Sequence, residues 1–175
     1  MKRIDNRRGQ IWVETVIYTL IGLAVIGLVL AVALPKINEK KDEVSIDQAI
    51  EALGHIDDKI YEVQRATGNK RVVDLDIGKG AVIVDMDNDT IAWILDSSFE
   101  YSEKDMVVPL GRLNVTTMTG NPWKVELKLG YAMDLQYKKD KLGTHQLDVA
   151  PTPYKFSIEN KGKENGNIVI DLSES

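Results

Sequence analysis

Few residues in this sequence are suited to catalysis or metal binding. The 175-residue chain has no cysteine, which excludes disulfides, thiolate catalysis and cysteine-ligated metal centres. Its two histidines, His55 and His145, have no visible acid–nucleophile partner set, and acids such as Asp74 and Asp76 are typical of a solvated face. No constellation supports catalysis. We therefore expect a protein that is not an enzyme and that needs no metal and no cofactor.

An acidic run offers a calcium-like spacing of oxygen ligands. Aspartates stand at the alternate positions 85, 87 and 89, and Asp96 is twelfth counted from Asp85. A calcium-binding EF-hand loop has this rhythm but requires Gly at its sixth position and Glu at its twelfth, where this chain has Thr90 and Asp96. Strand-like sequence on both sides favours a hairpin turn over a calcium site.

Two tripeptides match the acceptor sequence for N-glycosylation. They are Asn88-Asp89-Thr90 and Asn114-Val115-Thr116, which makes Asn88 and Asn114 candidate glycan sites if the segment carrying them is exported. Such tripeptides also occur by chance. The formal net charge of −5 argues against a nucleic-acid partner.

One carboxylate, Glu14, lies near the start of a long apolar segment. Residues 15–34 carry no charge, and as a helix they span ~30 Å, the thickness of a bilayer's hydrocarbon core. Residues 1–9 carry a net charge of +3, whereas residues 35–43 sum to zero. The positive-inside rule therefore predicts a membrane helix with a cytoplasmic N-terminus. A cleaved secretory signal is the competing interpretation, with Ala31 and Ala33 resembling its cut site.

The helical pattern continues beyond the apolar segment. From Ile46 to Val63 apolar residues recur every three or four positions, which predicts an amphipathic helix over 36–68. Gly68 is the expected stop, and Pro35 the expected kink near the membrane boundary. The helix as a whole is expected over residues ~11–67. Its apolar stripe is interpreted as packing against the domain that follows, or as a short coiled-coil seam.

Residues 69–175 change to the period of two that is typical of strands. The segment from Trp123 to Leu129 alternates apolar and charged residues, and both Trp93 and Trp123 are expected in the core. Hairpins are predicted around Asp87-Asn88-Asp89 and around Asn165-Gly166. The fold class is therefore α+β: a long N-terminal helix followed by an antiparallel β-sandwich of seven to nine strands, with an immunoglobulin-like arrangement as one option.

The junction between the basic leader and the apolar segment resembles a known signal. In RRGQIWVETVIY, residues 7–18, a basic cluster ends in Gly9, the apolar helix begins at Gln10, and its carboxylate is Glu14, the fifth residue after the glycine. This arrangement resembles the class III signal peptide of type IV pilins. The Gln after the glycine is most similar to archaeal members, because bacterial pilins usually have Phe there.

The resemblance implies a processing site and an assembly role. A membrane prepilin peptidase would cut between Gly9 and Gln10 on the cytoplasmic side, leaving residues 10–35 as the stem of the mature subunit. Glu14 would pair with the new α-amino group of Gln10, from its own chain or from a neighbour. The residues Gly27 and Ala31 form a small-xxx-small pair that lets helices approach closely.

Two functions remain open at this point. The first is a structural subunit of an extracellular type IV pilus-like filament for adhesion, motility or secretion, made of a cleaved leader (1–9), a stem, an amphipathic helix and an extracellular head (69–175). Its partners would be other pilin subunits, the peptidase and, before assembly, the membrane. The alternative is a solitary membrane-anchored β domain that binds a ligand outside the cell.

Overall fold

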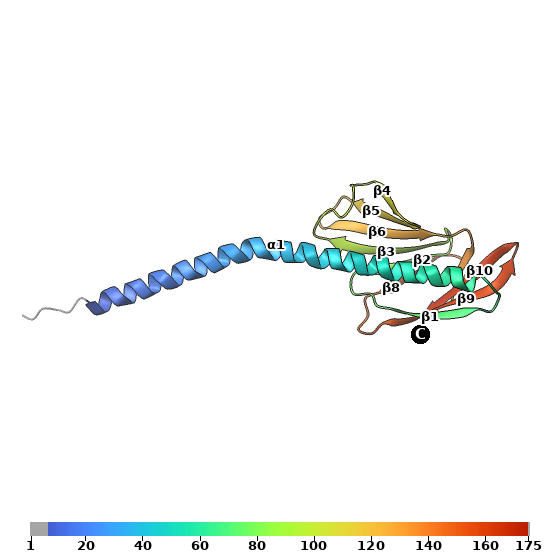
Figure 1. Ribbon diagram of the computed structural model, residues 1–175, viewed down its shortest axis with the longest axis horizontal. Helices are drawn as coiled ribbons and strands as arrows, with labels where there is room; N and C mark the ends of the chain where they lie inside the picture. The colour runs from blue at the N-terminus through green and yellow to red at the C-terminus, as the bar shows by residue number, and fades with distance from the viewer. Residues whose placement is uncertain (1–6, 175) are drawn as a thin grey trace, which may run out of the picture. The chain divides into compact units, whose positions relative to one another are not determined.

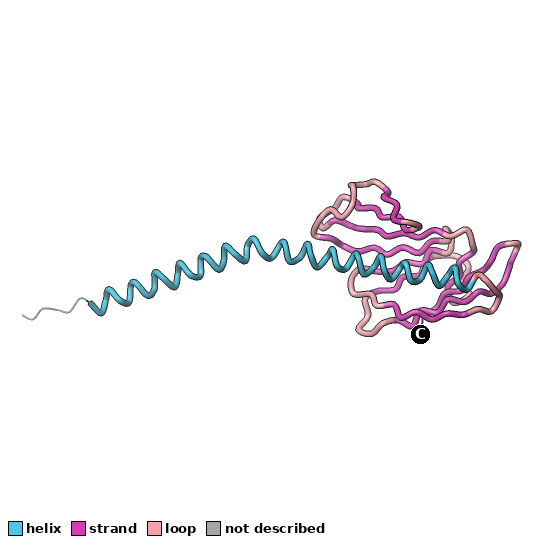
Figure 2. Tube along the Cα trace, in the orientation of Figure 1, coloured by secondary structure: helices cyan, strands magenta, loops and turns pink. Residues whose placement is uncertain are grey.

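The computed structural model describes the backbone of residues 7–174 and the side chains of residues 12–174. One helix, α1 (Arg7–Val63), precedes all of the strands, as Figure 2 shows. The chain divides into two compact units, Met1–Lys40 and Lys41–Ser175, and each is described here by itself. From here on we call residues 41–174 the head; it includes the C-terminal part of α1 as well as the strands of the predicted head, 69–175. Pro35 lies inside the helix, where its missing N–H removes one backbone bond.

Helix α1 begins and ends about four residues before the predicted bounds of 11 and 67. At its start, Arg7 and Arg8 are good helix formers and nothing in the sequence stops the helix there. At its end, the buried Asn160 amide donates to the carbonyl oxygens of Val63 (3.0 Å) and Gln64 (3.3 Å). These side-chain bonds end the helix early, because they satisfy carbonyls that otherwise lack partners. Gly68 follows in a turn with a φ of 83° instead of capping the helix directly.

The head contains two sheets, drawn in Figure 1. Its strands are β1 (Lys70–Leu75), β2 (Ala81–Asp85), β3 (Thr90–Ser97), β4 (Val107–Leu110), β5 (Leu113–Met118), β6 (Trp123–Gly130), β7 (Asp134–Tyr137), β8 (Thr144–Asp148), β9 (Tyr154–Glu164) and β10 (Asn167–Glu174). Four strands form the order β1-β9-β10-β7, and six form the order β4-β5-β6-β3-β2-β8. The predicted helix-plus-sandwich fold is confirmed, but the head has ten strands where seven to nine were predicted.

Both predicted hairpins are confirmed. In the first, β2 pairs with β3 across residues 86–89, with Ala81 opposite Ile94. In the second, β9 pairs with β10 around Asn165-Gly166, where both residues have positive φ angles of 53° and 96°. Asn and Gly are the residues that adopt such angles most readily in a two-residue hairpin turn. The turn chemistry in the sequence therefore accounts for the pairing of β9 with β10.

The strand order differs from the expected sandwich in two ways. One pair, β7 with β10, is parallel, although the expectation was antiparallel throughout. An immunoglobulin arrangement has seven or nine strands in another order, and these ten strands do not follow it. The parallel pair arises because β10 already pairs antiparallel with β9 on one side. After β6 in the larger sheet, the chain passes to the smaller sheet, where β7 pairs with the other side of β10. Such non-local pairing leaves no local signal in the sequence.

The helical part of the head supplies one side of its core. All six stripe residues have no exposed surface: Ile46, Ala49, Leu53, Ile56, Ile60 and Val63. They belong to one apolar cluster that includes residues of both sheets, such as Leu127 and Phe156. The prediction that this stripe packs against the following domain is confirmed, because the cluster lies within a single copy of the chain.

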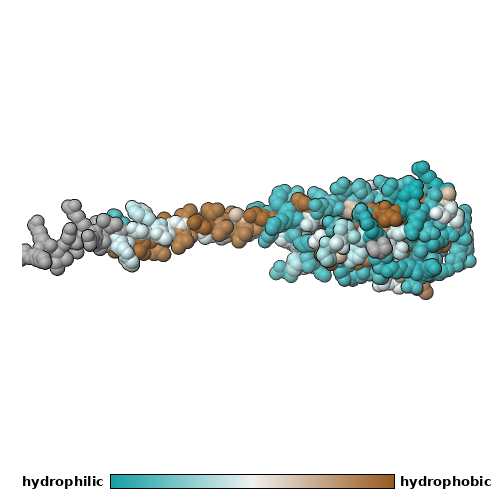
Figure 3. Space-filling model, turned by 90° about the horizontal axis from the view of Figure 1, so that it is seen from below, coloured by the Kyte–Doolittle hydropathy of each residue, from teal (hydrophilic) through white to brown (hydrophobic). Residues whose placement is uncertain are grey.

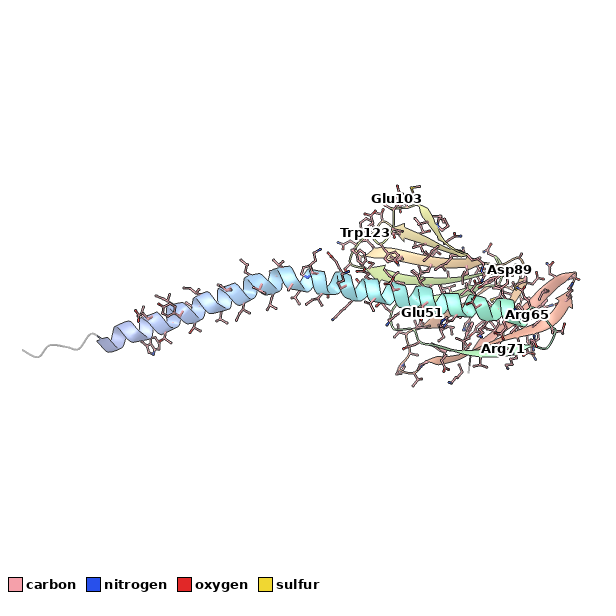
Figure 4. All side chains as sticks on the ribbon, in the orientation of Figure 1. Glu51, Arg65, Arg71, Asp89, Glu103 and Trp123 are labelled. Carbon is pink, nitrogen blue, oxygen red and sulfur yellow. The ribbon has the colours of Figure 1, made fainter. Side chains whose placement is uncertain are left out.

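Of the two tryptophans expected in the core, the structure places only Trp93 there. Trp93 is 3% exposed and donates its indole N–H to the carbonyl oxygen of Lys79 at 2.9 Å. Trp123 is half-buried, contrary to expectation, because it is the first residue of β6 and lies opposite Ser97, the last residue of β3. It therefore occupies the end of the sheet, where neighbours cover it incompletely (Figure 4).

Candidate functional site

The largest chemically distinctive surface among the described residues is the apolar part of α1. From here on we call residues 12–34 the stem; they make up most of the predicted segment 10–35, and their side chains are described. Its large apolar side chains are all exposed, from 41% for Val16 to 75% for Trp12. None of the most apolar part of the helix is buried within the described chain. Figure 3 shows this as a nearly continuous apolar rod, while the visible surface of the head is mostly hydrophilic.

Such a surface requires a non-aqueous environment. Removing one Val, Leu or Ile side chain from water is worth ~1.5–3 kcal/mol, so covering the stem is worth on the order of tens of kcal/mol. Side chains project from all around the stem in Figure 4, so a single protein contact on one side would leave much of it uncovered. Its length and composition are compatible with crossing a membrane. A bilayer and a bundle of similar helices are the two environments that cover every face.

Glu14 is exposed near the start of the stem. It shares the first two turns of the stem with Thr15, Tyr18 and Thr19, and the Thr19 hydroxyl donates to the Thr15 carbonyl oxygen at 2.8 Å. Residues four apart lie on one helix face, so Tyr18 lies above Glu14 and Thr19 above Thr15. The polar atoms of the stem are thus gathered at its N-terminal end, and the remainder is a purely apolar rod.

Gly27 and Ala31 lie one turn apart on the same face of the stem, and both are exposed. A Cβ atom added at Gly27 would meet nothing within 4 Å. The space that the missing side chain leaves is therefore unused within one copy of the chain. This geometry fits the predicted close approach of a second helix, which stays a prediction. Gly9 and Gln10 have helical backbone, and their side chains lie outside the described residues.

The two sequons lie in different surroundings. The Asn88 amide donates to the Asp85 carboxylate at 2.8 Å in the turn between β2 and β3. That bond occupies the nitrogen to which a glycan would be attached. Asn114 is exposed on β5, where it lies opposite Pro109 and Lys128. Modification at either residue stays a prediction.

The acidic run at Asp85 is a hairpin turn. The Asp85 carboxylate accepts backbone N–H groups of Asp87 (3.0 Å) and Asn88 (3.1 Å). The Asn88 amide, the larger influence, and these backbone bonds lower the pKa of Asp85, outweighing desolvation. Within residues 12–174 no group of three or more His, Asp or Glu side chains is arranged to hold a metal ion. The turn therefore accounts for the acidic spacing.

The two histidines lie apart in the head. His55 is exposed on α1. His145 stacks on Tyr137 with ring centroids 3.8 Å apart, and its pKa is lowered by burial and by the nearby Lys138 charge. Neither histidine shows a hydrogen bond to a serine or a carboxylate among the described contacts. Three of the titratable residues singled out in the sequence, His55, Asp74 and Asp76, line one open pocket of about 340 Å³ beside α1, together with Glu51 and Lys79.

An ion pair that sequence reasoning missed joins α1 to the loop before β2. The carboxylate of the buried Asp42 accepts a hydrogen bond from the Lys79 ammonium and another from the Ser98 backbone N–H at 2.7 Å. Desolvation raises the pKa of Asp42, but the bonds from Lys79 and Ser98 outweigh it, so the pKa is lowered. No periodicity could reveal this pair, because its members are 37 residues apart.

Replacing Asp42 should make the head less stable near neutral pH. The folded-state pKa of Asp42 lies below the ordinary pKa of an aspartate, so the carboxylate stabilises the head at pH values above that ordinary pKa. This contribution is lost as the pH falls through the folded pKa. We expect Asp42→Asn to lower the free energy of unfolding by about 1–3 kcal/mol near neutral pH, and the difference to vanish at strongly acidic pH. Urea denaturation of the full chain in detergent measures both values.

The matched control is Asp74→Asn. Asp74 pairs with Lys155 at 2.5 Å, but both side chains are about 60% exposed. Exposed pairs contribute little, so this variant should change the free energy of unfolding by less than ~1 kcal/mol at any pH. An Asp42→Asn effect that does not depend on pH would contradict the assigned role of its charge.

Comparison of the chain with protein-family models, with curated proteins and with solved structures found no match.

Proposed function

We propose that this chain is a structural subunit of an extracellular filament similar to type IV pili, assembled through its stem. One observation carries the proposal: the stem is an apolar helix with no buried face, and its single carboxylate lies at its leader end. A filament core of packed stems would cover every face of such a helix. The head, which has its own core, would form the outer part of the filament.

In this proposal the precursor is inserted in the membrane before assembly, with its N-terminus in the cytoplasm. The basic leader, residues 1–9, holds that orientation by the positive-inside rule. A membrane prepilin peptidase then cuts between Gly9 and Gln10, and identical or related subunits join the filament outside the cell. The head would serve adhesion, motility or secretion, with N-linked glycans on Asn88 or Asn114 where an export system adds them. Residues 7–18 are most similar to the signal peptides of archaeal pilins, which supports an archaeal origin of the chain.

A solitary membrane anchor is the competing proposal. An anchor needs an apolar helix, but it needs neither a glycine at the end of its basic leader nor a carboxylate in the first turns of the apolar segment. Gly9 and Glu14 therefore favour the filament. A carboxylate in a membrane helix raises the free energy of insertion, by less near the interface than at the bilayer centre. Such residues usually have a functional role.

Replacing Gly9 tests the proposal. In cells that make the wild-type protein, we expect surface filaments that contain this chain, visible by electron microscopy and identifiable by peptide mass spectrometry. With Gly9→Leu, the bulky side chain should block the cut, so the full-length precursor should stay in the membrane and the filaments should disappear. The control Asn6→Ala changes the leader without touching the residue before the cut, and it should leave filament yield unchanged.

Two results would decide against the filament. One is a wild-type protein that stays in the membrane at full length and forms no filament, which would favour the solitary anchor. The other is a surface protein that begins beyond Ala33, which would indicate an ordinary secretory signal. Unchanged filaments in the Gly9→Leu variant would contradict the assigned cut site.

A further inference from the structure

An apolar groove of about 330 Å³ lies in the head between α1 and the β4–β5 hairpin. We call it the hairpin groove. Its sides come from Ile50 and Gly54 on α1 and from Leu110 and Leu113 on the hairpin. The buried Leu129 of β6 also lines it. These five residues are apolar, and the two other residues that line the groove, Asp57 and Arg112, are charged. The groove is therefore mainly apolar.

Gly54 keeps the α1 side of the groove open. A Cβ atom added there would meet nothing within 4 Å, and the residue is exposed. Glycine is less favourable than alanine inside a helix, because it loses more backbone freedom on folding. No contact within the described chain requires glycine at this position. The open space beside Gly54 is available to a second chain that packs against the helix.

The hairpin side of the groove carries the longest run of exposed apolar residues in the head. Met106, Val107, Val108 and Leu110 are 51%, 62%, 37% and 51% exposed. They lie on or beside β4, one of the two edge strands of the six-stranded sheet (Figure 1). Apolar patches of this kind on a soluble surface typically mark an interaction site.

Pro109 makes side-chain docking more favourable than the addition of a strand. Across the β4–β5 turn Leu110 lies opposite Leu113, so the next pair, Pro109 with Asn114, is one whose backbone groups point away from the partner strand. A residue there would normally offer its N–H at the free edge of the sheet. Proline has none, which weakens pairing with an added strand. The exposed side chains remain free to pack.

The charged residues at the groove neutralise each other. The Arg112 guanidinium donates through Nε to the Asp57 carboxylate at 2.6 Å and lies over the Tyr61 ring, 4.0 Å from its centroid. Asp57 is buried, so a charged occupant would have to displace or compete with this pair. An uncharged apolar occupant would leave the pair intact. The groove is therefore complementary to an uncharged apolar rod.

We propose that the hairpin groove binds the stem of a neighbouring copy of this chain. The inference rests on the proposed filament. From Thr15 to Leu34 the stem carries no charge, and its apolar side chains are exposed on every face. The stem therefore matches the groove as an uncharged apolar partner. Its apolar surface must also be covered when the subunit leaves the membrane. Residues spaced three, four and seven apart along the stem would enter the groove, as in other helix-in-groove contacts.

The size of the groove explains why this contact would form only in an assembly. A stable complex buries ~800 Å² on each partner, and one groove beside a four-residue edge strand is smaller than that. Isolated copies should therefore not pair through it. In a filament, contacts between stems hold the copies close together. The effective concentration of a neighbouring stem at the groove is then high, so that even a small contact area is enough for binding.

A groove-filling substitution tests the proposal without weakening the head. Gly54→Leu places a large side chain in the groove and improves helix propensity, so the melting temperature of the full chain in detergent should be unchanged or higher. Filament yield should nevertheless fall at least ~10-fold, which corresponds to a loss of about 1.4 kcal/mol in assembly. The control Gly54→Ala gains helix propensity but fills little of the groove, and it should assemble like the wild type.

Cysteine cross-linking identifies the occupant, because the natural chain has no cysteine. Copies carrying Gly54→Cys are produced together with copies carrying one cysteine at successive positions from Val25 to Leu34, and the filaments are oxidised. We expect disulfide-linked pairs at stem positions three, four and seven apart and not at the positions between them. The control Glu51→Cys lies on α1 outside the groove and should not link to the stem.

The outcomes separate this inference from the proposed function. Wild-type cells without filaments would overturn both. Wild-type filaments together with equal yields for Gly54→Leu, or with no stem position linked to Gly54→Cys, would overturn the groove contact and leave the filament standing. Linkage of Gly54→Cys to the head of another copy, or binding of the groove to lipid vesicles in place of the stem, would also overturn it.

Discussion

Cells that carry Glu14→Gln are expected to make mature subunits but almost no filaments. The substitution keeps the shape of the side chain and removes its charge. In a packed core of stems, an α-amino group paired with Glu14 would be left without its counter-charge. Losing one member of a buried ion pair costs about 3–5 kcal/mol, which is more than ~100-fold in an assembly equilibrium. Mature monomer should therefore accumulate in the membrane.

Three readouts distinguish a defect in assembly from a defect in folding or processing. The head should keep its melting temperature, because its apolar core is built without Glu14. Membrane insertion should be slightly easier without the charge. The cut should still occur, because Glu14 lies four residues beyond Gln10. Equal numbers of filaments on Glu14→Gln and wild-type cells would contradict the assembly role and weaken the case for a filament.

The second large effect is expected in the core of the head. Ile56 has no exposed surface and lies in the middle of the α1 stripe. Ile56→Ala removes three buried carbon atoms and leaves a cavity, which should cost about 2–5 kcal/mol. Because a typical domain is stable by ~5–15 kcal/mol, this is a large share of the total. Urea denaturation of the full chain in detergent, followed by near-ultraviolet circular dichroism, measures the change.

The matched control is Glu51→Ala on the exposed side of the same helix (Figure 4). It should change the free energy of unfolding by no more than about 0.5 kcal/mol, since surface substitutions away from special contacts have small effects. A similar loss in both variants would mean that the stripe does not lie in the core.

Features with a strong local pattern could be predicted from the sequence. The stripe from Ile46 to Val63 has a helical period, and all six of its residues are buried. The hairpin at Asn165-Gly166 was predictable because these residues accept positive φ angles. The apolar helix of the stem was predictable in the same way, from the uncharged run between residues 15 and 34.

Features that depend on distant partners could not be predicted. The helix ends at Val63 because an amide 97 residues later in the sequence, that of Asn160, caps it. Trp123 is half-buried because β6 begins there, which an alternating pattern does not reveal. The hairpin groove combines residues of α1, β4, β5 and β6, and each of them taken alone reads as an ordinary helix or strand residue.

The central claim is that the subunit of the filament is the chain without its leader. The most direct measurement is the intact mass and N-terminal sequence of the protein in filaments sheared from its native cell surface. The account predicts a mature chain that begins at Gln10 and retains the whole stem. A surface protein that begins beyond Ala33, or a full-length chain found only in the membrane, would contradict it.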